Sequence, residues 1–107
     1  MVSNSFLFTE TAERDFDEII SYISVSLCNP GAARAFYDKL AESIRTTCNY
    51  PESGSPVIND FLKENGVRKQ LIGNYVMYYC YSAQKHNVLI LRIVYGKRNP
   101  DDIIKSL

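Results

Sequence analysis

The spacing of apolar residues changes once along this chain, near residue 50, and the change limits the folds open to it. Before that point, apolar side chains recur every three or four residues, which is the period of an amphipathic helix. After it, runs of β-branched and aromatic residues alternate with short turns, as in β-strands. A chain with its helices first and most of its strands later is typical of the α+β class.

Two helices are predicted in the first half, over residues 10–28 and 30–49. Thr9 or Thr11 can cap the first helix, after a short β-prone run at residues 6–9. Asn29 can cap the second, because proline is tolerated at a first helical position and Pro30 follows. The connection is about two residues long, so the two helices should form an antiparallel hairpin.

Three further strands are predicted at residues 67–72, 76–82 and 88–95, and their short connections favour an antiparallel meander. The last is apolar on both faces apart from Arg92, so it should lie centrally under the helices. Residues 50–66 read as a loop with a helical turn at 60–64, and Asn99 can cap a short final helix. We therefore expect one α+β domain over residues 1–107, in the order βααβββα, with a helical hairpin packed on a mainly antiparallel four-stranded sheet.

The composition, 46% hydrophobic and 22% charged, is that of a globular protein and excludes disordered and low-complexity classes. No apolar run approaches the roughly 20 residues that span a bilayer. The first ten residues lack the basic region and long apolar core of a signal peptide. The three cysteines are widely spaced and odd in number. We expect a cytoplasmic protein without membrane contact and with reduced thiols.

The net charge of zero conceals a division between the two parts of the chain. Residues 1–60 carry four basic and nine acidic side chains, and residues 61–107 carry eight basic and three acidic ones. The first part therefore has a net charge of −5 and the second +5. An acidic partner for the basic part explains this pattern, and so does mutual neutralisation within one compact domain.

Most catalytic and cofactor sites are excluded by the residues present. His86 is the only histidine, it falls in a predicted turn, and no cysteine pair has the spacing of metal ligands. The chain has no histidine placed to serve a nucleophilic triad and no glycine-rich phosphate loop. The acidic residues fall mainly on the outer faces of the predicted helices. We expect no metal and no cofactor.

Basic and tyrosine side chains remain as candidates for binding. The cations are Arg68, Lys69, Arg92, Lys97 and Arg98. They can clamp phosphates, and the interleaved tyrosines 75, 78, 79, 81 and 95 can stack on bases, although tyrosines in strands more often serve packing. Arg92 interrupts an apolar strand, so its charge needs a partner. A structural ion pair with a helix acid and a functional anion site both meet that need.

The order and spacing of several short motifs resemble the RelE/ParE toxin superfamily of bacterial type II toxin–antitoxin modules. The motifs are Ala12-x-x-Asp15-Phe16-x-x-Ile19, Asn29-Pro30 with Ala32-Ala33, Tyr50-Pro51, Gly66-Val67-Arg68-Lys69, Gly73-Asn74-Tyr75, Tyr78-Tyr79 and Ile90-x-Arg92-Ile93-x-Tyr95-Gly96-Lys97-Arg98-Asn99. The resemblance covers nearly the whole chain and is closest to the ParE branch.

This resemblance implies a small toxin that a cognate antitoxin holds inactive, in an oligomeric complex. RelE-like members cut mRNA in the ribosomal A site, with basic residues and often a C-terminal tyrosine or histidine, whereas the studied ParE-like members inhibit DNA gyrase. Arg98 matches the arginine that RelE-like enzymes keep after the last strand, but their middle-strand arginine falls at Val76 and their C-terminal tyrosine near Ile104. We therefore expect a ParE-like gyrase inhibitor of a plasmid-stabilisation module, with no confident catalytic residue.

Two alternatives remain open. One is a ribosome-dependent mRNA endonuclease that uses Arg68, Arg92 and Arg98 electrostatically. The other is a decayed toxin that acts only as an antitoxin-binding module. In the preferred interpretation the five cations bind partners. An antitoxin segment should place apolar side chains on the helical hairpin or the sheet edge, and its acids should face Arg68, Lys69 or Arg98.

Overall fold

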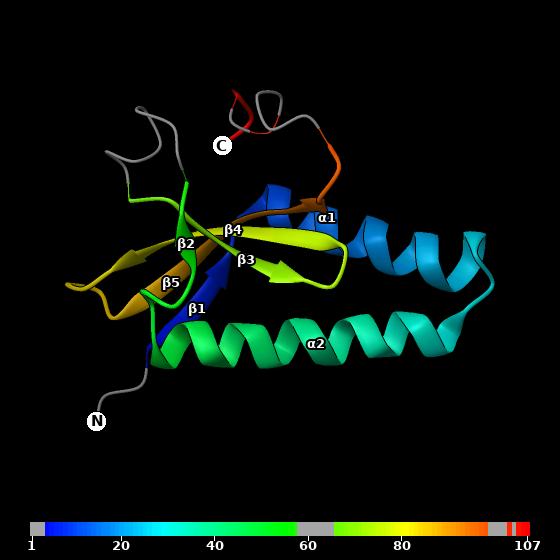
Figure 1. Ribbon diagram of the computed structural model, residues 1–107, viewed down its shortest axis with the longest axis horizontal. Coiled ribbons are helices and arrows are strands. Elements are labelled where there is room, and N and C mark those ends of the chain that lie inside the picture. The colour runs from blue at the N-terminus through cyan, green and yellow to red at the C-terminus, as the bar shows by residue number, and fades with distance from the viewer. Residues whose placement is uncertain (1–3, 58–65, 99–102, 104) are drawn as a thin grey trace.

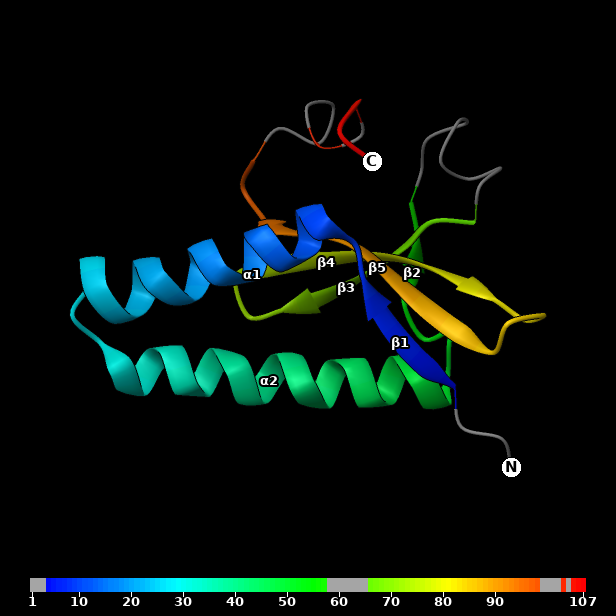
Figure 2. The ribbon, with the colours of Figure 1, turned by 180° about the vertical axis from the view of Figure 1, so that it is seen from behind.

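The computed structural model describes residues 4–57, 66–98, 103 and 105–107, and it confirms the α+β class (Figure 1). In chain order the elements are β1 Ser5–Phe8, α1 Glu10–Ser21, the π-helical turn η1 Tyr22–Ser26, α2 Pro30–Asn49, β2 Ser55–Pro56, β3 Arg68–Ile72, β4 Tyr75–Ser82 and β5 Asn87–Tyr95. The two helices run antiparallel and extend beyond the end of the sheet (Figures 1 and 2). No helix among the described residues is long and apolar enough to cross a membrane.

The sheet has five strands in the order β1-β5-β4-β3-β2, one more than predicted. β1 lies parallel to β5, and the other neighbours are antiparallel. The additional strand is β2, where Ser55 pairs with Lys69 and Pro56 with Arg68 inside the segment predicted as a loop. Two residues are too few to produce a periodic pattern. The predicted helical turn at 60–64 and the predicted cap at Asn99 lie outside the described residues.

The predicted helix caps are present. The Thr9 hydroxyl accepts a hydrogen bond from the Ala12 amide at 3.0 Å, and the Asn29 side chain accepts one from the Ala32 amide at 3.0 Å. The first helix is regular only to Ser21 and continues as a π-turn to Ser26. In that turn the Ser24 hydroxyl donates to the Ile20 carbonyl. In a regular α-helix this carbonyl would accept from the Ser24 amide, so the side chain competes with the backbone for it.

Apolar clusters cover both faces of the sheet. The larger one lies between the helices and the sheet and includes Ile19, Phe36 and Tyr79. A smaller one lies on the opposite face. Its members are Val57, Val67, Val76, Tyr78, Val94 and Ile103. β5 lies between β1 and β4, as its apolar sequence on both faces predicts.

A β-bulge in β5 sets which side chains face the helices. Tyr78 pairs with Arg92 and Tyr79 with Ile90, so Leu91 is an additional residue on β5. Ile90 therefore packs in the cluster under the helices, while Leu91 packs against the opposite cluster. The Thr9 hydroxyl donates to the Leu91 carbonyl at 3.0 Å and fixes the bulge to the start of α1.

Candidate functional site

A pocket of about 450 Å³ lies on the sheet face opposite the helices, and two of the five predicted cations line it. Its apolar walls come from the smaller cluster, with Val76, Val94 and Ile103 among them. Lys69 on β3 and Arg98 beyond β5 add positive charge, and both side chains are exposed. The arrangement is an apolar hollow with basic groups at its margin, which suits an anionic partner group.

The turn after β5 holds Arg98 against this pocket. The Gly96 amide donates to the Asn74 carbonyl at 2.8 Å, and the Arg98 amide donates to the Tyr95 carbonyl at 3.1 Å. A Cβ at Gly96 would lie 3.0 Å from the Asn74 carbonyl oxygen, so glycine suits this close approach. Lys97 in the same turn is exposed and does not line the pocket.

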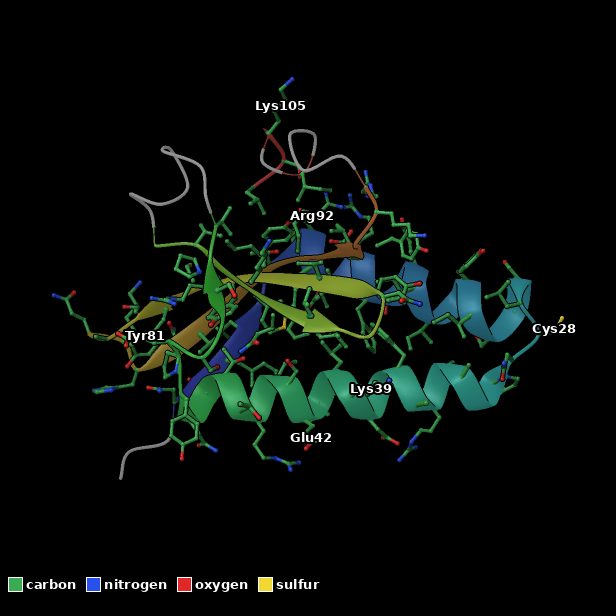
Figure 3. The ribbon with its side chains drawn as sticks, viewed as in Figure 1. Cys28, Lys39, Glu42, Tyr81, Arg92 and Lys105 are labelled. Atoms are coloured by element: carbon green, nitrogen blue, oxygen red, sulfur yellow. The ribbon has the colours of Figure 1, made fainter. Side chains whose placement is uncertain are left out.

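Arg92 forms a structural ion pair with a helix acid, which is the first of the two alternatives left open by the sequence. Its Nε donates to Asp15 Oδ2 at 2.9 Å and its Nη2 donates to Asp15 Oδ1 at 2.7 Å. The hydrogen bond to Asp15 raises the pKa of Arg92 above its ordinary value, although burial opposes the shift. Its Nη1 donates to the Ser106 hydroxyl at 2.7 Å, so one guanidinium joins β5, α1 and the C-terminal residues (Figure 3).

Arg68 also uses its guanidinium within the protein. Its Nη1 donates to the Gly54 carbonyl at 2.7 Å and to the Glu52 carbonyl at 3.3 Å. These bonds hold the loop before β2 against β3. The predicted set of five cations is therefore divided. Arg68 and Arg92 are engaged in structure, whereas Lys69, Lys97 and Arg98 are exposed.

The tyrosines of the strands divide in the same way. Tyr78 and Tyr79 are buried, one in each apolar cluster. The Tyr79 hydroxyl donates to the Pro51 carbonyl at 2.7 Å and accepts from the Gly54 amide at 3.0 Å. Burial raises the pKa of both phenols. Tyr81 and Tyr95 are exposed and Tyr75 is half-buried, so these three keep ring surface available to a partner.

Of the two positions that decide between the branches of the superfamily, Val76 lies in this region. Val76 is 9% exposed and packs within the smaller apolar cluster. Ile104 lies outside the described residues. His86 is exposed in the β4–β5 turn, where its φ of 52° is left-handed, and it does not line the pocket. Over residues 4–57, 66–98, 103 and 105–107, no group of three metal-ligating side chains is present.

The helical hairpin and the sheet edge, where an antitoxin segment is expected from the sequence, enclose an apolar groove of about 560 Å³ between β1, α1 and α2, whose lining was not predicted. Its lining includes Phe6, Phe16, Tyr37 and Ile44, and Arg45 is the one cation among the described residues that line it. β1 is an edge strand of the sheet, and Phe6 is 49% exposed. The groove combines residues 40 positions apart, so no local pattern reveals it.

A family model described as the ParE toxin of the type II toxin–antitoxin system parDE matches residues 6–100. The chain belongs to this family. It is thus a toxin of the ParE/RelE type, as the spacing of its motifs indicated. No curated protein sequence matches this toxin.

Solved structures share the fold of this toxin. The chromosomal ParDE toxin–antitoxin system of Pseudomonas aeruginosa superposes with a TM-score of 0.70 at 20% identity, over 89% of this chain and 98% of that one. The RelBE2 toxin–antitoxin complex of Mycobacterium tuberculosis superposes with a TM-score of 0.63 at 23% identity, over 89% of this chain and 93% of that one. A YoeB/ParE toxin of Agrobacterium tumefaciens superposes with a TM-score of 0.61 at 14% identity, over 85% of this chain and 96% of that one.

Proposed function

We propose that this ParE-family toxin inhibits DNA gyrase without cutting nucleic acid, and that a cognate antitoxin holds it inactive. The observation that carries the proposal is the burial of Val76 with Val94 and Ile103 in the sheet-face pocket. A ribonuclease of the superfamily would place a phosphate-binding arginine at position 76. An apolar wall there gives no stabilisation to the charge that develops during phosphodiester cleavage.

The described residues that line the pocket include no carboxylate or histidine to act as a general base. Among the described residues that line it, the ionisable groups are Lys69, Tyr78, Tyr95 and Arg98. Burial raises the pKa of Tyr78, which keeps its phenol protonated at neutral pH. A protonated phenol can donate a proton but cannot remove one from an attacking hydroxyl. These groups therefore support binding of an anionic surface better than hydrolysis.

The groove between β1 and the helical hairpin is the surface that we assign to the antitoxin. An apolar groove beside a free strand edge suits an amphipathic segment that packs its apolar side chains inward. Lys69 and Arg98 line the opposite face of the sheet, so a segment in the groove would face Arg45 instead. An antitoxin that also neutralises Lys69 and Arg98 must therefore pass around the molecule.

Induction of the toxin in bacterial cells tests this proposal. We expect growth arrest with loss of negative supercoiling in a reporter plasmid, while transcripts mapped by primer extension stay intact. Co-expression of the protein encoded by the neighbouring gene should restore growth and co-purify with the toxin. New cuts within translated mRNA would support the RelE-like alternative. Unimpaired growth with retained antitoxin binding would support the decayed toxin.

For the antitoxin surface, the variant Phe6→Glu places a charge in the groove while leaving the sheet-face pocket intact. It should abolish co-purification of the antitoxin and retain toxicity. Leu7→Glu is the matched control, because Leu7 is 56% exposed on the same strand and does not line this groove. Equal effects of both variants would contradict the assignment.

A further inference from the structure

Three tyrosines from separate elements converge at the end of the sheet, in a pocket that adjoins the sheet-face pocket and shares Tyr95 and Arg98 with it. Tyr22 begins η1, Tyr75 begins β4 and Tyr95 ends β5. All three line one pocket of about 580 Å³ between the helical hairpin and the ends of β4 and β5. The ring centroids of Tyr75 and Tyr95 are 5.7 Å apart with planes at 64°, and Phe36 packs behind Tyr75 at 5.0 Å.

The phenol groups of these tyrosines are close to one another. The pKa of Tyr75 is raised by burial, and further by the neighbouring phenols of Tyr22 and Tyr95. Within the part of the chain that the structure describes, the three hydroxyls form no hydrogen bond to other side chains or to the backbone. Tyr22 is 53% exposed and Tyr95 43%, so much of their ring surface has no protein contact.

The helix wall of this pocket is acidic. Asp15 and Glu18 line it from α1, and the charge of Glu18 contributes to the raised pKa of Arg92. Asp15 is neutralised by its ion pair, which leaves the carboxylate of Glu18 without a salt bridge among the described residues. Glu18 lies one helical turn before Tyr22, so carboxylate and ring share one side of the helix.

The backbone that presents Tyr22 is unusual. The α-helix changes to a π-turn at this residue, and the Leu27 amide bonds back to the Tyr22 carbonyl at 2.9 Å. π-Turns inside helices are frequent at functional sites, because the wider turn redirects side chains. The same turn leaves Leu27, 54% exposed, at the margin of the pocket.

We propose that Tyr22, Tyr75 and Tyr95, together with Glu18, form an aromatic site for a cationic side chain, an arginine of a partner polypeptide. Tyrosine rings attract a guanidinium through their electron-rich faces, and phenol oxygens and a carboxylate accept its hydrogen bonds. Arg98 also lines this pocket, as it lines the sheet-face pocket. Its positive charge opposes the binding of a second cation, and the negative charge of Glu18 offsets that repulsion. The inference goes beyond gyrase inhibition and does not depend on it.

Titration of the full chain with Nα-acetyl-arginine methylamide, followed by NMR of the tyrosine ring and backbone resonances, tests this site. We expect saturable shifts at Tyr22, Tyr75 and Tyr95 with a millimolar dissociation constant. The citrulline analogue has nearly the same shape without the charge and should bind at least about fivefold more weakly. Inorganic phosphate and acetyl-glutamate methylamide should produce no saturable shift changes at these resonances.

Variants locate the binding. Tyr22→Ala and Glu18→Gln should each weaken arginine binding by about fivefold. Both positions are exposed, so the fold should be retained. Tyr37→Ala is the matched control, because Tyr37 is also an exposed helix tyrosine, 48% exposed, but lies in the other groove. Equal binding of citrulline, saturation by phosphate or glutamate, or absence of saturation at the solubility limit of the arginine compound would each overturn the proposal.

Discussion

The Asp15–Arg92 pair connects α1 to the middle of the sheet through three hydrogen bonds to one carboxylate. Besides the two bonds from the guanidinium, Asp15 Oδ2 accepts from the Ile93 amide at 3.1 Å. The two side chains are 9% and 12% exposed, and no buried polar side-chain atom among the described residues lacks a partner. Removing one member of a buried ion pair leaves the charge of the other member buried and unpaired, which is unfavourable for the folded state.

Replacing one member of this pair should therefore be strongly destabilising. Asp15→Ala should lower the free energy of unfolding by about 3–5 kcal/mol, measured by urea denaturation. Asp38→Ala is the control, since the Arg34–Asp38 pair on α2 is exposed and should contribute less than about 1 kcal/mol. Equal effects of the two substitutions would show that burial of the pair is unimportant.

Lys97 and Arg98 should act at the surface rather than in folding, because both are exposed. The double variant Lys97→Ser/Arg98→Ser should weaken binding to the gyrase–DNA complex by about fivefold at low salt, with no change in thermal stability. The difference should shrink as the salt concentration rises, because exposed charges are screened. The pair Lys39→Ser/Lys105→Ser removes the same charge elsewhere (Figure 3) and should have little effect. A deficit that persists in high salt would contradict an electrostatic role.

At the scale of elements, the loop before β2 packs closely against β3 and β4 at Gly54. A Cβ at Gly54 would lie 2.5 Å from the Tyr79 hydroxyl and 2.6 Å from the Lys69 carbonyl oxygen. Arg68 and Tyr79 bond to the backbone of the same loop, and Gln70 Nε2 donates to the Ser53 hydroxyl at 2.7 Å. Three side chains of β3 and β4 therefore hold the loop in place through hydrogen bonds.

Gly54→Ala should displace this loop and lower the free energy of unfolding by about 1–3 kcal/mol. Gly31→Ala should be neutral or stabilising, because its nearest contact would be 3.7 Å away and alanine favours the helix. Chemical denaturation of the two variants makes the comparison. A Gly54→Ala protein as stable as the unchanged chain would contradict the close packing described here.

The helices could be predicted because each has a periodic apolar pattern and a local cap, Thr9 or Asn29. The four longer strands could be predicted from their β-branched and aromatic runs. The features that were not predicted depend on contacts between distant segments. β2 exists only through its pairing with β3, and the bulge at Leu91 only through the register of β4 against β5. The sequence named Arg92 as a charge that needs a partner, but only the fold identifies Asp15.

At the scale of the whole molecule, few direct contacts between described residues neutralise the opposite charges of the two parts of the chain. Among the described residues, Asp15–Arg92 is the one salt bridge that joins the acidic and basic parts. The other exposed charges face solvent, so an electrostatic field remains available to partners. Lys69 and Arg98 lie on a different face from the apolar groove, which favours a partner that contacts more than one face.

The three cysteine thiols differ in burial, so their reactivity measures how far the folded protein opens. Cys28 is exposed at the tip of the helical hairpin, whereas Cys48 is buried and Cys80 is half-buried (Figure 3). Burial raises the pKa of both Cys48 and Cys80, which lowers their thiolate content at neutral pH. Iodoacetamide should therefore modify Cys28 first, and the other two only as the protein opens, as measured by mass spectrometry. Modification of all three at equal rates in the folded protein would contradict this arrangement.

The most direct test of the central claim compares two reactions of the purified toxin. In one, gyrase supercoils relaxed plasmid, and in the other, programmed ribosomes present mRNA in the A site. We predict that the toxin inhibits supercoiling, that the antitoxin reverses the inhibition, and that mRNA stays intact. Cleavage of mRNA in the A site, abolished by Arg98→Ala, together with normal supercoiling, would contradict the account and establish the endonuclease.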